Sequence, residues 1–313
     1  MASRYGTIHT NQPLTNILVG YNPTDFIADM IVPKVSVKKK SGTYYVYSQG
    51  EILTIDDYQR RGGTKSARID PITASSDTYN CKRYSLDALV TDEDMENADL
   101  PIKLKEHAAK KCKNKILRKR EYDMASYLFN TTTFSGYTAA LTGTDRWNDP
   151  SSYPIDKVLA TSDTISLNCG YKPNTMIMGQ DVYTSLKTHP QFTNYVSSNM
   201  DKNITTAKMA EAFNIDRVIV GSSIYNSAKE GQTVSNARLW GKYVLLAYIA
   251  PSPQIDEPSL MYSFRWNAGK IKSEMVKEYR DETLESDVIE YGLNYDDKLV
   301  GASLGYLLST VVS

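Results

Sequence analysis

The segment Gly301-Ala302-Ser303-Leu304-Gly305 matches G-x-S-x-G, the pattern that places a nucleophilic serine on the strand-to-helix turn of serine hydrolases. That chemistry needs a histidine downstream of the serine to accept its proton. The chain ends at Ser313, and its last histidine is His189. The order of the parts is therefore wrong for this catalysis. An ordinary strand or turn explains Ser303 better, and a serine hydrolase using Ser303 stays as an alternative that a fluorophosphonate label would test.

Metal and cofactor sites find little support in the sequence. The three histidines and three cysteines are widely separated, without the paired spacing that zinc sites need, and the lack of C-x-x-C fits a reducing compartment. Neither glycine-rich phosphate-binding motif, G-x-x-x-x-G-K-[ST] or G-x-G-x-x-G, occurs. Asp92, Glu93 and Asp94 could hold a cation, but they also suit the first turn of a helix. We therefore expect no catalytic residue, cofactor or metal.

A densely basic segment is the remaining candidate for a chemical role. It runs from Lys103 to Arg120 and contains a single acid, Glu106. Because no aromatic residues alternate with the lysines, it would bind nucleic acid by neutralising phosphates, without reading a sequence. The alternatives are a solvated helix face or pairing with the acids of a neighbour. The basic residues are Lys103, Lys105, Lys110, Lys111, Lys113, Lys115, Arg118, Lys119 and Arg120.

The same segment predicts one long helix between Pro101 and Phe129. Asp99 suits its N-cap, and Pro101 suits its first turn, where the missing N–H costs nothing. Such a helix is roughly 45 Å long, so its narrow apolar stripe suggests a beam across an extended molecule. The stripe repeats every four residues, as Leu104, Ala108, Cys112 and Ile116, and then Met124 and Leu128.

Composition limits the class of protein. The 313 residues suffice for one large domain or two modest ones. The 36 basic and 36 acidic residues cancel but are segregated, with bases in 34–68 and 103–120 and acids in 278–297. This indicates contacts between copies or a face turned to a polyanion, with ordinary solvated faces as the alternative. No apolar run reaches the ~18 residues of a membrane span and no signal segment is apparent, so we expect synthesis in the cytoplasm.

The N-terminal third predicts extended structure that cannot stabilise itself. Residues 1–33 resemble an arm with a short helix at Thr24–Met30. Strand-like runs at Val35–Leu53 and Ser76–Leu89 flank a polar, glycine-bearing tip at Arg60–Thr64. A two-stranded ribbon alone is barely stable in water, so it needs another copy to lie on. The 23 tyrosines, against 6 phenylalanines, also suit interfaces between subunits, although they are equally good strand formers.

The rest of the chain predicts a mixed α+β domain. Strand, helix, helix and strand follow one another closely after residue 170, and strands dominate after Trp240. The expected helices are Asp156–Ser166, Asp181–Thr188 and Thr205–Phe213. The expected strands are Thr175–Met178, Asp216–Val220, Tyr243–Ile249, Met261–Trp266, Lys272–Glu278, Val288–Leu293 and Ala302–Leu308.

This order of parts resembles the major capsid proteins of tailed bacteriophages, which have the HK97-type fold. The likeness covers most of the chain in order, although each stretch alone is weak. The stretches are Asn22-Pro23-Thr24-Asp25-Phe26-Ile27-Ala28-Asp29, Ser76-Asp77-Thr78-Tyr79-Asn80-Cys81-Lys82-Arg83-Tyr84, Pro173-Asn174-Thr175-Met176-Ile177-Met178-Gly179, Phe213-Asn214-Ile215-Asp216-Arg217-Val218-Ile219-Val220 and Leu239-Trp240-Gly241-Lys242.

The resemblance implies a set of parts. Residues 1–37 would be the N-terminal arm, and 38–88 the extended loop (E-loop) that lies over a neighbouring subunit through its tip, Arg60, Arg61, Gly62, Gly63 and Thr64. Residues 89–167 would be the peripheral domain, with the spine helix at about 100–129. Residues 168–250 would be the axial domain, and 251–313 would complete the peripheral strands.

The resemblance also implies a function, that of a non-enzymatic shell protein forming pentamers and hexamers in the icosahedral head of a virion. Its partners would be packaged double-stranded DNA, a separate scaffolding protein, a portal and, outside the shell, cement proteins. The interior, DNA-facing residues would be Lys103, Lys110, Lys111, Lys113, Lys115, Arg118 and Lys119. The nearest alternative is an encapsulin-like nanocompartment shell that encloses an enzyme instead of DNA.

Overall fold

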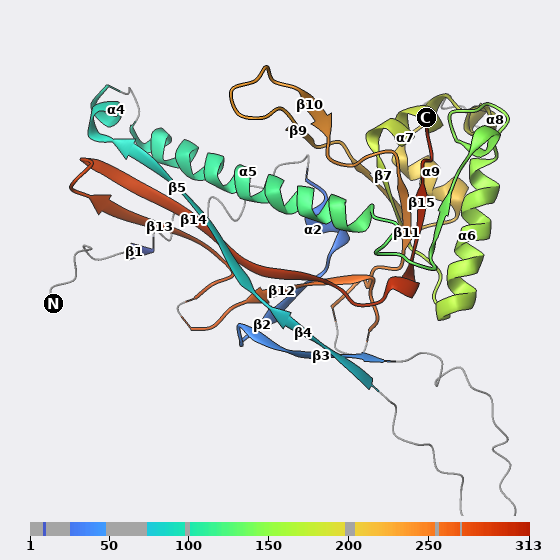
Figure 1. Ribbon diagram of the computed structural model, residues 1–313, viewed down its shortest axis with the longest axis horizontal. Coiled ribbons are helices and arrows are strands. Elements are labelled where there is room, and N and C mark those ends of the chain that lie inside the picture. The colour runs from blue at the N-terminus through green and yellow to red at the C-terminus, as the bar shows by residue number, and fades with distance from the viewer. Residues whose placement is uncertain are drawn as a thin grey trace, which may run out of the picture.

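The structure is a computed structural model of the 313-residue chain. It describes residues 9–10, 26–47, 74–97, 101–197, 204–253, 257–269 and 271–313. A long twisted sheet forms one end of the molecule and a compact α/β region forms the other, and the helix α5 (Pro101–Leu128) runs along the sheet as far as the compact region (Figure 1). The molecule is therefore elongated, as the length of the predicted helix suggested.

The long sheet is organised around one strand, β14 (Ser286–Leu299). On one side it pairs with β5 over ten residues, from Ser286–Thr91 to Tyr295–Lys82. On the other side it pairs with β13 and then with β12, and the two-residue strand β1 adds to the outer edge of β13. The bounds are β1 His9–Thr10, β2 Lys34–Val37, β5 Lys82–Thr91, β12 Met261–Trp266 and β13 Glu274–Asp281, and a short helix, α4 (Asp92–Glu96), follows β5.

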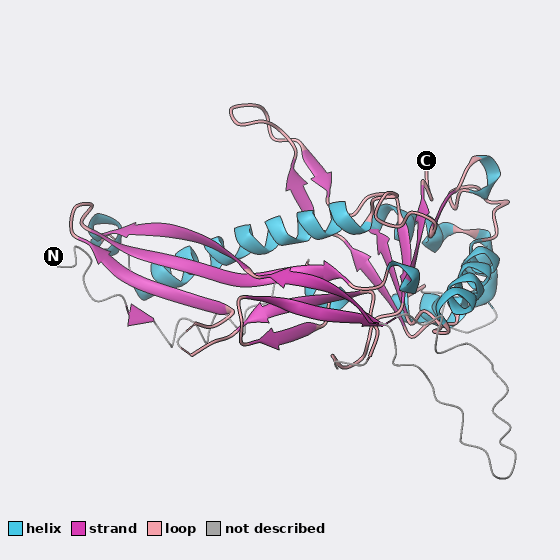
Figure 2. Ribbon diagram, turned by 60° about the horizontal axis from the view of Figure 1, so that its bottom comes forward, coloured by secondary structure: helices cyan, strands magenta, loops and turns pink. Residues whose placement is uncertain are grey.

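The predicted long helix is present as α5 and lies on one face of this sheet (Figures 1 and 2). Its apolar stripe packs against alternate residues of β14 and β5, among them Ile289 and Tyr291. The stripe continues towards the compact region, where Met124 and Leu128 join a second cluster with the short arm helix α2 (Ala28–Ile31). The expected N-cap, Asp99, lies outside the described residues.

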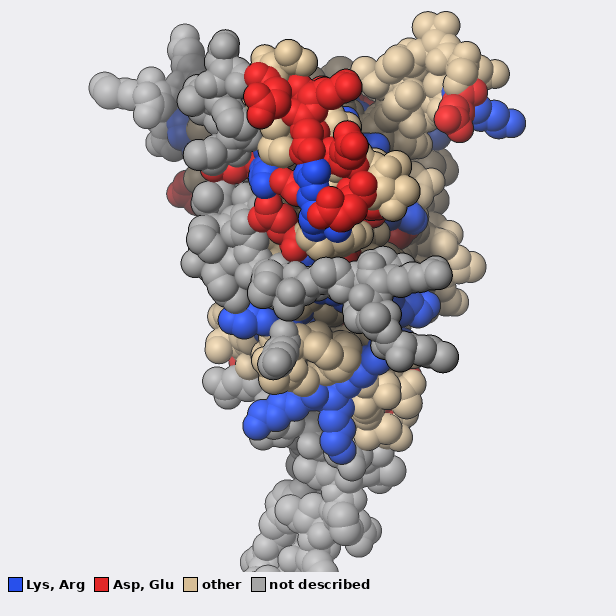
Figure 3. Space-filling view, turned by 90° about the vertical axis from the view of Figure 1, so that its left-hand side faces the viewer, with Lys and Arg blue, Asp and Glu red and all other residues tan. Residues whose placement is uncertain are grey.

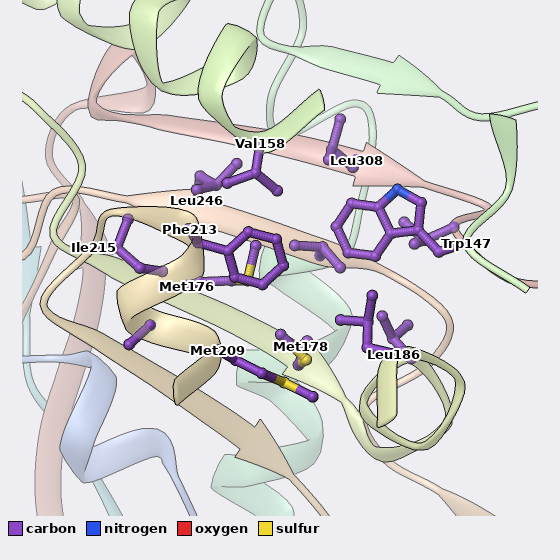
Figure 4. Packing of buried hydrophobic residues seen from close by; sticks show 14 of the residues in the cluster. Trp147, Val158, Met176, Met178, Leu186, Met209, Phe213, Ile215, Leu246 and Leu308 are labelled. Carbon is purple, nitrogen blue, oxygen red and sulfur yellow. The ribbon is translucent and has the colours of Figure 1, made fainter. Parts of the chain in front are cut away.

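The compact region has a five-stranded mixed sheet in the order β6-β15-β11-β7-β8. Its fully buried strands are continuous apolar runs, as expected when helices and loops cover a sheet. Met176 and Met178 of β7 pack with Phe213 of α9 and Trp147 in the core shown in Figure 4. The bounds are β6 Thr138–Ala140, β7 Thr175–Gly179, β8 Arg217–Gly221, β11 Val244–Ala247, β15 Gly305–Ser309, α6 Pro154–Cys169, α7 Gln180–Thr188, α8 Pro190–Ser197 and α9 Thr206–Phe213.

Two hairpins leave the body of the molecule. The ribbon of β3 (Ser41–Tyr47) and β4 (Ala74–Asn80) projects from the base of the long sheet (Figure 1). The hairpin of β9 (Ile224–Asn226) and β10 (Asn236–Arg238) projects above α5, where Tyr225 contacts Tyr122 edge to face (Figure 2). The sequence did not predict this second hairpin.

The structure corrects two groupings made from the sequence. The run Ser76–Leu89 is two strands that meet at Cys81: β4 pairs with β3, whereas β5 belongs to the long sheet, so the loop expected at 38–88 ends near residue 80. The end of the chain does not complete the long sheet either. Residues 302–304 form the short 3-10 turn η2 (Ala302–Leu304), and β15 pairs with β11 of the compact sheet. The helix α6 also belongs to the compact region, because its buried residues pack in the same core.

Candidate assembly and charge surfaces

The cations of α5 divide into a buried group and an exposed stripe. The Nζ atom of Lys113 lies 3.0 Å from Glu274, and only 2% of its side chain is exposed. The Nζ atom of Lys105 lies 2.7 Å from both Glu278 and Asp287. These cations face the acids of β13 and β14. The expectation that Lys113 faces DNA is therefore wrong, because its charge is neutralised inside the subunit.

Arg120 forms the centre of a second buried network. Its side chain is 2% exposed, its Nε donates to Asp297 over 2.7 Å, and its Nη1 donates to Asp29 of the arm helix over 2.5 Å. Arg265 from β12 also reaches Asp29, over 3.2 Å. The guanidinium groups of Arg120 and Arg265 both approach the ring of Tyr295, where cation–π attraction adds to the ion pairs.

Glu121, the next residue, is the capping group of the arm helix. Its carboxylate is fully buried and accepts the backbone N–H of Ile27 over 3.0 Å and that of Ala28 over 2.9 Å. Ile27 occupies the N-cap of α2, and its apolar side chain cannot accept a hydrogen bond from these backbone N–H groups. Burial raises the pKa of Glu121, and the donated hydrogen bonds oppose that shift.

The exposed cations of α5 follow one stripe of the helix. Lys111, Lys115 and Arg118 are exposed and three or four residues apart, which places them on one face. The half-buried Lys110 lies 4.0 Å from Glu106, and the exposed Lys119 pairs with Asp123. The side chain of Lys103 and the predicted loop tip, Arg60, Arg61, Gly62, Gly63 and Thr64, lie outside the described residues. The candidate polyanion surface is thus narrower than the sequence suggested.

Acidic side chains gather at the far end of the long sheet, around α4 and the turn between β13 and β14 (Figure 3). Thr91 caps α4 by accepting from Asp94 N, and the guanidinium of Arg280 binds the Asp92 carboxylate in a bidentate pair at 2.6 and 2.5 Å. These acids therefore serve the helix start and a salt bridge. Within the described ranges, no three metal-ligating side chains converge.

The geometry around Ser303 is not that of a nucleophile elbow. The residue lies in η2, which leads into the strand β15, whereas the elbow requires a strand followed by a helix. The alternative of a serine hydrolase using Ser303 is therefore not supported by the local fold.

A buried serine–histidine pair does exist elsewhere, but its protonation is wrong for catalysis. The Nε2 atom of His189 lies 3.0 Å from the hydroxyl of Ser152 and 3.1 Å from the carbonyl of Asp149. The Nδ1 atom accepts the N–H of Gln191 over 3.2 Å, so the ring proton resides on Nε2. A histidine that donates from Nε2 cannot take the proton of Ser152, and the pair instead fixes the start of α8.

One position of the predicted apolar stripe is occupied by a cation, and this was the sequence signal for the buried charge of Arg120. The stripe repeats every four residues from Leu104 to Ile116 and resumes at Met124, and Arg120 occupies the position between them. A cation at a core position must find buried partners, which Asp29 and Asp297 provide. No local pattern marked Glu121, because its partners are distant in sequence.

Among the helices described, none combines the length and apolar character needed to cross a bilayer. No family model matches the chain. Two curated relatives are similar: the major capsid protein of Burkholderia phage BcepMu is 26% identical over 305 residues, 95% of each chain, and that of Pseudomonas phage JBD67 is 27% identical over 238 residues, 75% of each.

Solved structures share the fold over nearly the whole chain. A phage-related protein from Bordetella bronchiseptica RB50 superposes with a TM-score of 0.78 at 20% identity, with 98% of this chain and 99% of that chain covered. The mature capsid of bacteriophage PhiM1 superposes with a TM-score of 0.55 at 11% identity, covering 98% and 91%. The chain therefore has the HK97-type fold of phage capsid shells, and its sequence is similar to phage major capsid proteins along almost its entire length.

Proposed function

We propose that this chain is a major capsid protein, the structural subunit of an icosahedral phage head that encloses double-stranded DNA. The observation that carries the proposal is the similarity to the BcepMu major capsid protein over 95% of both chains, together with the HK97-type fold. The role is that of a building unit of a shell, and its principal partner is a further copy of itself.

The shape of the subunit supports this role. A projecting ribbon and a thin sheet backed by one helix expose much backbone and side-chain surface to water, which is costly for a monomer. Large apolar residues such as Leu89 (53% exposed) and Leu167 (84% exposed) remain uncovered on the subunit. Contacts between many copies would remove these surfaces from water.

We assign the parts of the shell subunit as follows. The arm comprises residues 1–37, and the extended loop runs from 38 to about 80. The peripheral region comprises the long sheet and α5, and the axial region comprises the compact sheet with its helices, including α6 and β15. This assignment revises the ranges 89–167, 168–250 and 251–313 expected from the sequence. The helix α6 and the strand β15 move from the peripheral to the axial region, because β15 pairs within the compact sheet and α6 packs on it.

The remaining partners follow from the shell role. Lys111, Lys115 and Arg118 would face packaged DNA and bind it by charge alone. A separate scaffolding protein, a portal and external cement proteins would complete the head. The protein would be synthesised in the cytoplasm of the bacterial host and would end in the virion.

Expression of the chain alone, followed by negative-stain electron microscopy, tests the proposal. Closed shells, or sheets and tubes with hexagonal order, support it. Particles that contain nucleic acid support the phage head, whereas particles that lack nucleic acid and enclose a co-expressed enzyme would indicate a nanocompartment. A chain that stays monomeric even with candidate scaffolding proteins from the same genome would contradict the shell role.

A further inference from the structure

A half-open cleft of about 210 Å³ lies where the C-terminal half of α5 passes over β14. It is close to the base of the β3–β4 ribbon, because Asp296 in its wall accepts the backbone N–H of Asn80 over 2.7 Å. The walls combine aromatic rings with carboxylates. These rings and carboxylates are Tyr84, Tyr127, Tyr295, Asp123, Asp296 and Asp297.

The cleft carries an excess of negative charge. Among the described residues that line it, Arg120 is the single basic one, and that guanidinium is already bound by Asp297 and by Asp29 outside the cleft. Asp123 pairs with Lys119, which is 63% exposed and therefore easily exchanged for another cation. Asp296 has one backbone hydrogen bond and the more distant Lys298, at 4.0 Å.

The titrating groups of the cleft reflect this potential. Burial raises the pKa of Tyr84, and the charges of Asp123 and Asp296 raise it further. Burial also raises the pKa of the Asp296 carboxyl. The hydrogen bond from Asn80 and the charges of Lys298 and Lys82 oppose this shift, and the neighbouring charge of Asp297 adds to it. A cation entering the cleft would relieve both effects, because it would stabilise the carboxylates at close range.

The aromatic rings add a second attraction for a cation. Tyr295 is buried and holds Tyr84 in place by stacking, with the ring centroids 4.8 Å apart, whereas Tyr84 and Tyr127 remain 37% and 44% exposed at the cleft. Carboxylates beside tyrosine faces are a combination that suits an ammonium or guanidinium group, because the ring faces attract cations. The cleft is therefore shaped for a cationic side chain.

The same chain presents such side chains on a rigid turn. Lys38, Lys39 and Lys40 connect β2 to β3, and all three are exposed. The turn is fixed to the body, since the carbonyl of Lys40 accepts from Cys81 N over 2.9 Å and that of Lys38 accepts from Trp266 Nε1 over 3.2 Å. Three adjacent like charges repel one another, and within the described part of the chain no ion pair offsets this repulsion.

We propose that the lysine turn, Lys38–Lys40, of one copy inserts into this cleft of a second copy, where an ammonium group binds Asp123 and Asp296 beside the exposed rings of Tyr84 and Tyr127. The contact rests on the shell role proposed above. Each subunit offers one turn and one cleft, so the contact passes head to tail from copy to copy and closes when the subunits form a ring. A turn that is already rigid loses little conformational freedom on binding.

Carbodiimide cross-linking of isotopically mixed shells tests the contact directly. This reagent joins a carboxylate to an amine only when the two touch. Shells assembled from equal amounts of ¹⁴N- and ¹⁵N-labelled chains are cross-linked, digested and analysed by mass spectrometry. We expect peptides that join Asp123 or Asp296 to a lysine of the turn, with half of them isotopically mixed. Cross-links within one copy from Asp123 to Lys119 or from Asp296 to Lys298 pair only equal isotopes and do not bear on the contact. Shells in which the turn–cleft peptides are absent, pair only equal isotopes, or are replaced by isotopically mixed peptides to a different lysine would overturn the proposal.

Paired variants measure the contribution of the contact to assembly. Asp123→Asn with Asp296→Asn keeps the shape of the cleft and removes two charges, and should raise the protein concentration needed for shells at least tenfold. Asp163→Asn with Glu230→Gln removes two exposed charges elsewhere and should change it less than twofold. Circular dichroism and thermal melting of the unassembled subunits confirm that each variant folds.

Neutralising the turn separates the contact from DNA binding. Changing Lys38, Lys39 and Lys40 to Gln should give the same assembly defect as the cleft variant, and combining the two should add little, because they remove one interaction. A turn variant that assembles normally but retains less nucleic acid would overturn the proposal in favour of a polyanion site. Wild-type shells without the cross-link would refute this contact alone, whereas failure of the wild type to form shells under any condition would refute the shell role.

Discussion

The indole Nε1 of Trp240 donates a hydrogen bond of 2.6 Å to the buried carboxylate of Glu121, and this bond joins the compact region to the spine helix. The same carboxylate caps the arm helix through Ile27 and Ala28. Segments separated by 94 and 119 residues thus meet at one side chain. The position of the arm and the position of the compact region relative to α5 therefore depend on the same group.

Replacing Glu121 by Ala should destabilise the subunit by about 3 kcal/mol, because three buried donors lose their acceptor and each costs about 1–3 kcal/mol before the structure relaxes. Urea unfolding of unassembled subunits, followed by circular dichroism, measures the change. The matched control on the same helix is Glu106→Ala. Its half-buried carboxylate makes only a long ion pair with Lys110, at 4.0 Å, so we expect the free energy of unfolding to change by about 0.5 kcal/mol or less. Equal effects of the two variants would contradict the capping role.

Arg120 should be far less tolerant of substitution than Arg118. Arg120→Met leaves the carboxylates of Asp29 and Asp297 without their buried partner, which typically costs about 3–5 kcal/mol. Arg118→Met removes an exposed cation on the opposite face and should cost about 0.5 kcal/mol or less. Chemical denaturation gives both values. If the two substitutions cost the same, the network around Arg120 does not stabilise the fold.

Asp29 should make the subunit sensitive to acid. Burial alone would raise its pKa, but the charges of Arg120, Lys34 and Arg265 outweigh burial and hold the pKa of Asp29 well below its usual range. The folded state therefore binds this proton more weakly than the unfolded state does. The stabilisation is complete above the ordinary carboxyl range and is lost as the pH falls below about 4.

Urea midpoints at pH 3 and pH 7 test this dependence. The midpoint of the wild type should fall more steeply between pH 7 and pH 3 than that of Asp29→Asn, while Asp163→Asn, on the exposed face of α6, should follow the wild type. The raised pKa of Glu121 gives the opposite pH dependence, because it stabilises the folded state as the pH falls, but this contribution is common to all three proteins. An Asp29→Asn variant with the wild-type pH dependence would contradict the prediction.

Gly179 is required by a close approach of two backbones. A Cβ atom at this position would lie 1.9 Å from the carbonyl oxygen of Gly241, where neither backbone can move without disrupting β7. Gly179→Ala should therefore lower the unfolding free energy by about 3 kcal/mol or more, or prevent folding. At Gly241 the added Cβ would meet only the ring of Tyr243 at 3.4 Å, so Gly241→Ala is the matched control and should cost about 1 kcal/mol or less. Soluble yield and thermal melting distinguish the two.

Deleting Arg60–Ser66 tests the proposed role of the extended loop. The segment lies outside the described residues, and the strands β3 and β4 that lead to it remain paired through seven positions. We expect the subunit to fold with an unchanged melting temperature but to form no stable shells. Sedimentation of the deletion variant beside the wild type gives the answer, and shells of normal size and stability would contradict the loop's role in assembly.

The elements that the sequence predicted well are those whose pattern is local. The helix α5 was expected at 101–129 and extends over Pro101–Leu128, because its stripe and starting proline are contained in the segment itself. The strands β7 and β12 were also recovered, since short apolar runs between turn residues are buried wherever they lie.

Pairing between distant segments could not be predicted from the sequence. The sequence near Cys81 does not show that β4 pairs with β3 while β5 pairs with β14, because β4 and β5 have the same strand-like alternation of side chains. For the same reason, β15 was expected in the long sheet, whereas it pairs with β11 of the compact sheet. The same limitation also hid the surfaces: Lys113 and Arg118 look alike in the sequence, yet one is buried beside Glu274 and the other is exposed.

The exposed stripe of α5 gives the prediction on nucleic acid. Changing Lys111, Lys115 and Arg118 to Gln should leave folding intact, because none of them is buried. Binding of a short DNA duplex to unassembled subunits should weaken, and the slope of log affinity against log salt should decrease by roughly 2–3, since each phosphate contact contributes about 0.9. Fluorescence anisotropy at several salt concentrations measures this slope.

A control variant separates a specific surface from net charge. Lys157, Lys172 and Lys229 lie on the compact region and the β9–β10 hairpin and are exposed as well. Changing them to Gln removes the same three charges, so an effect of overall charge would weaken DNA binding equally in both variants. Because a phosphate backbone must touch a cation to release its counterions, only the α5 variant should change the slope if this helix lines the interior. Equal slopes for the two variants would mean that α5 is not the DNA-facing surface, and its cations would then face solvent or a neighbouring subunit.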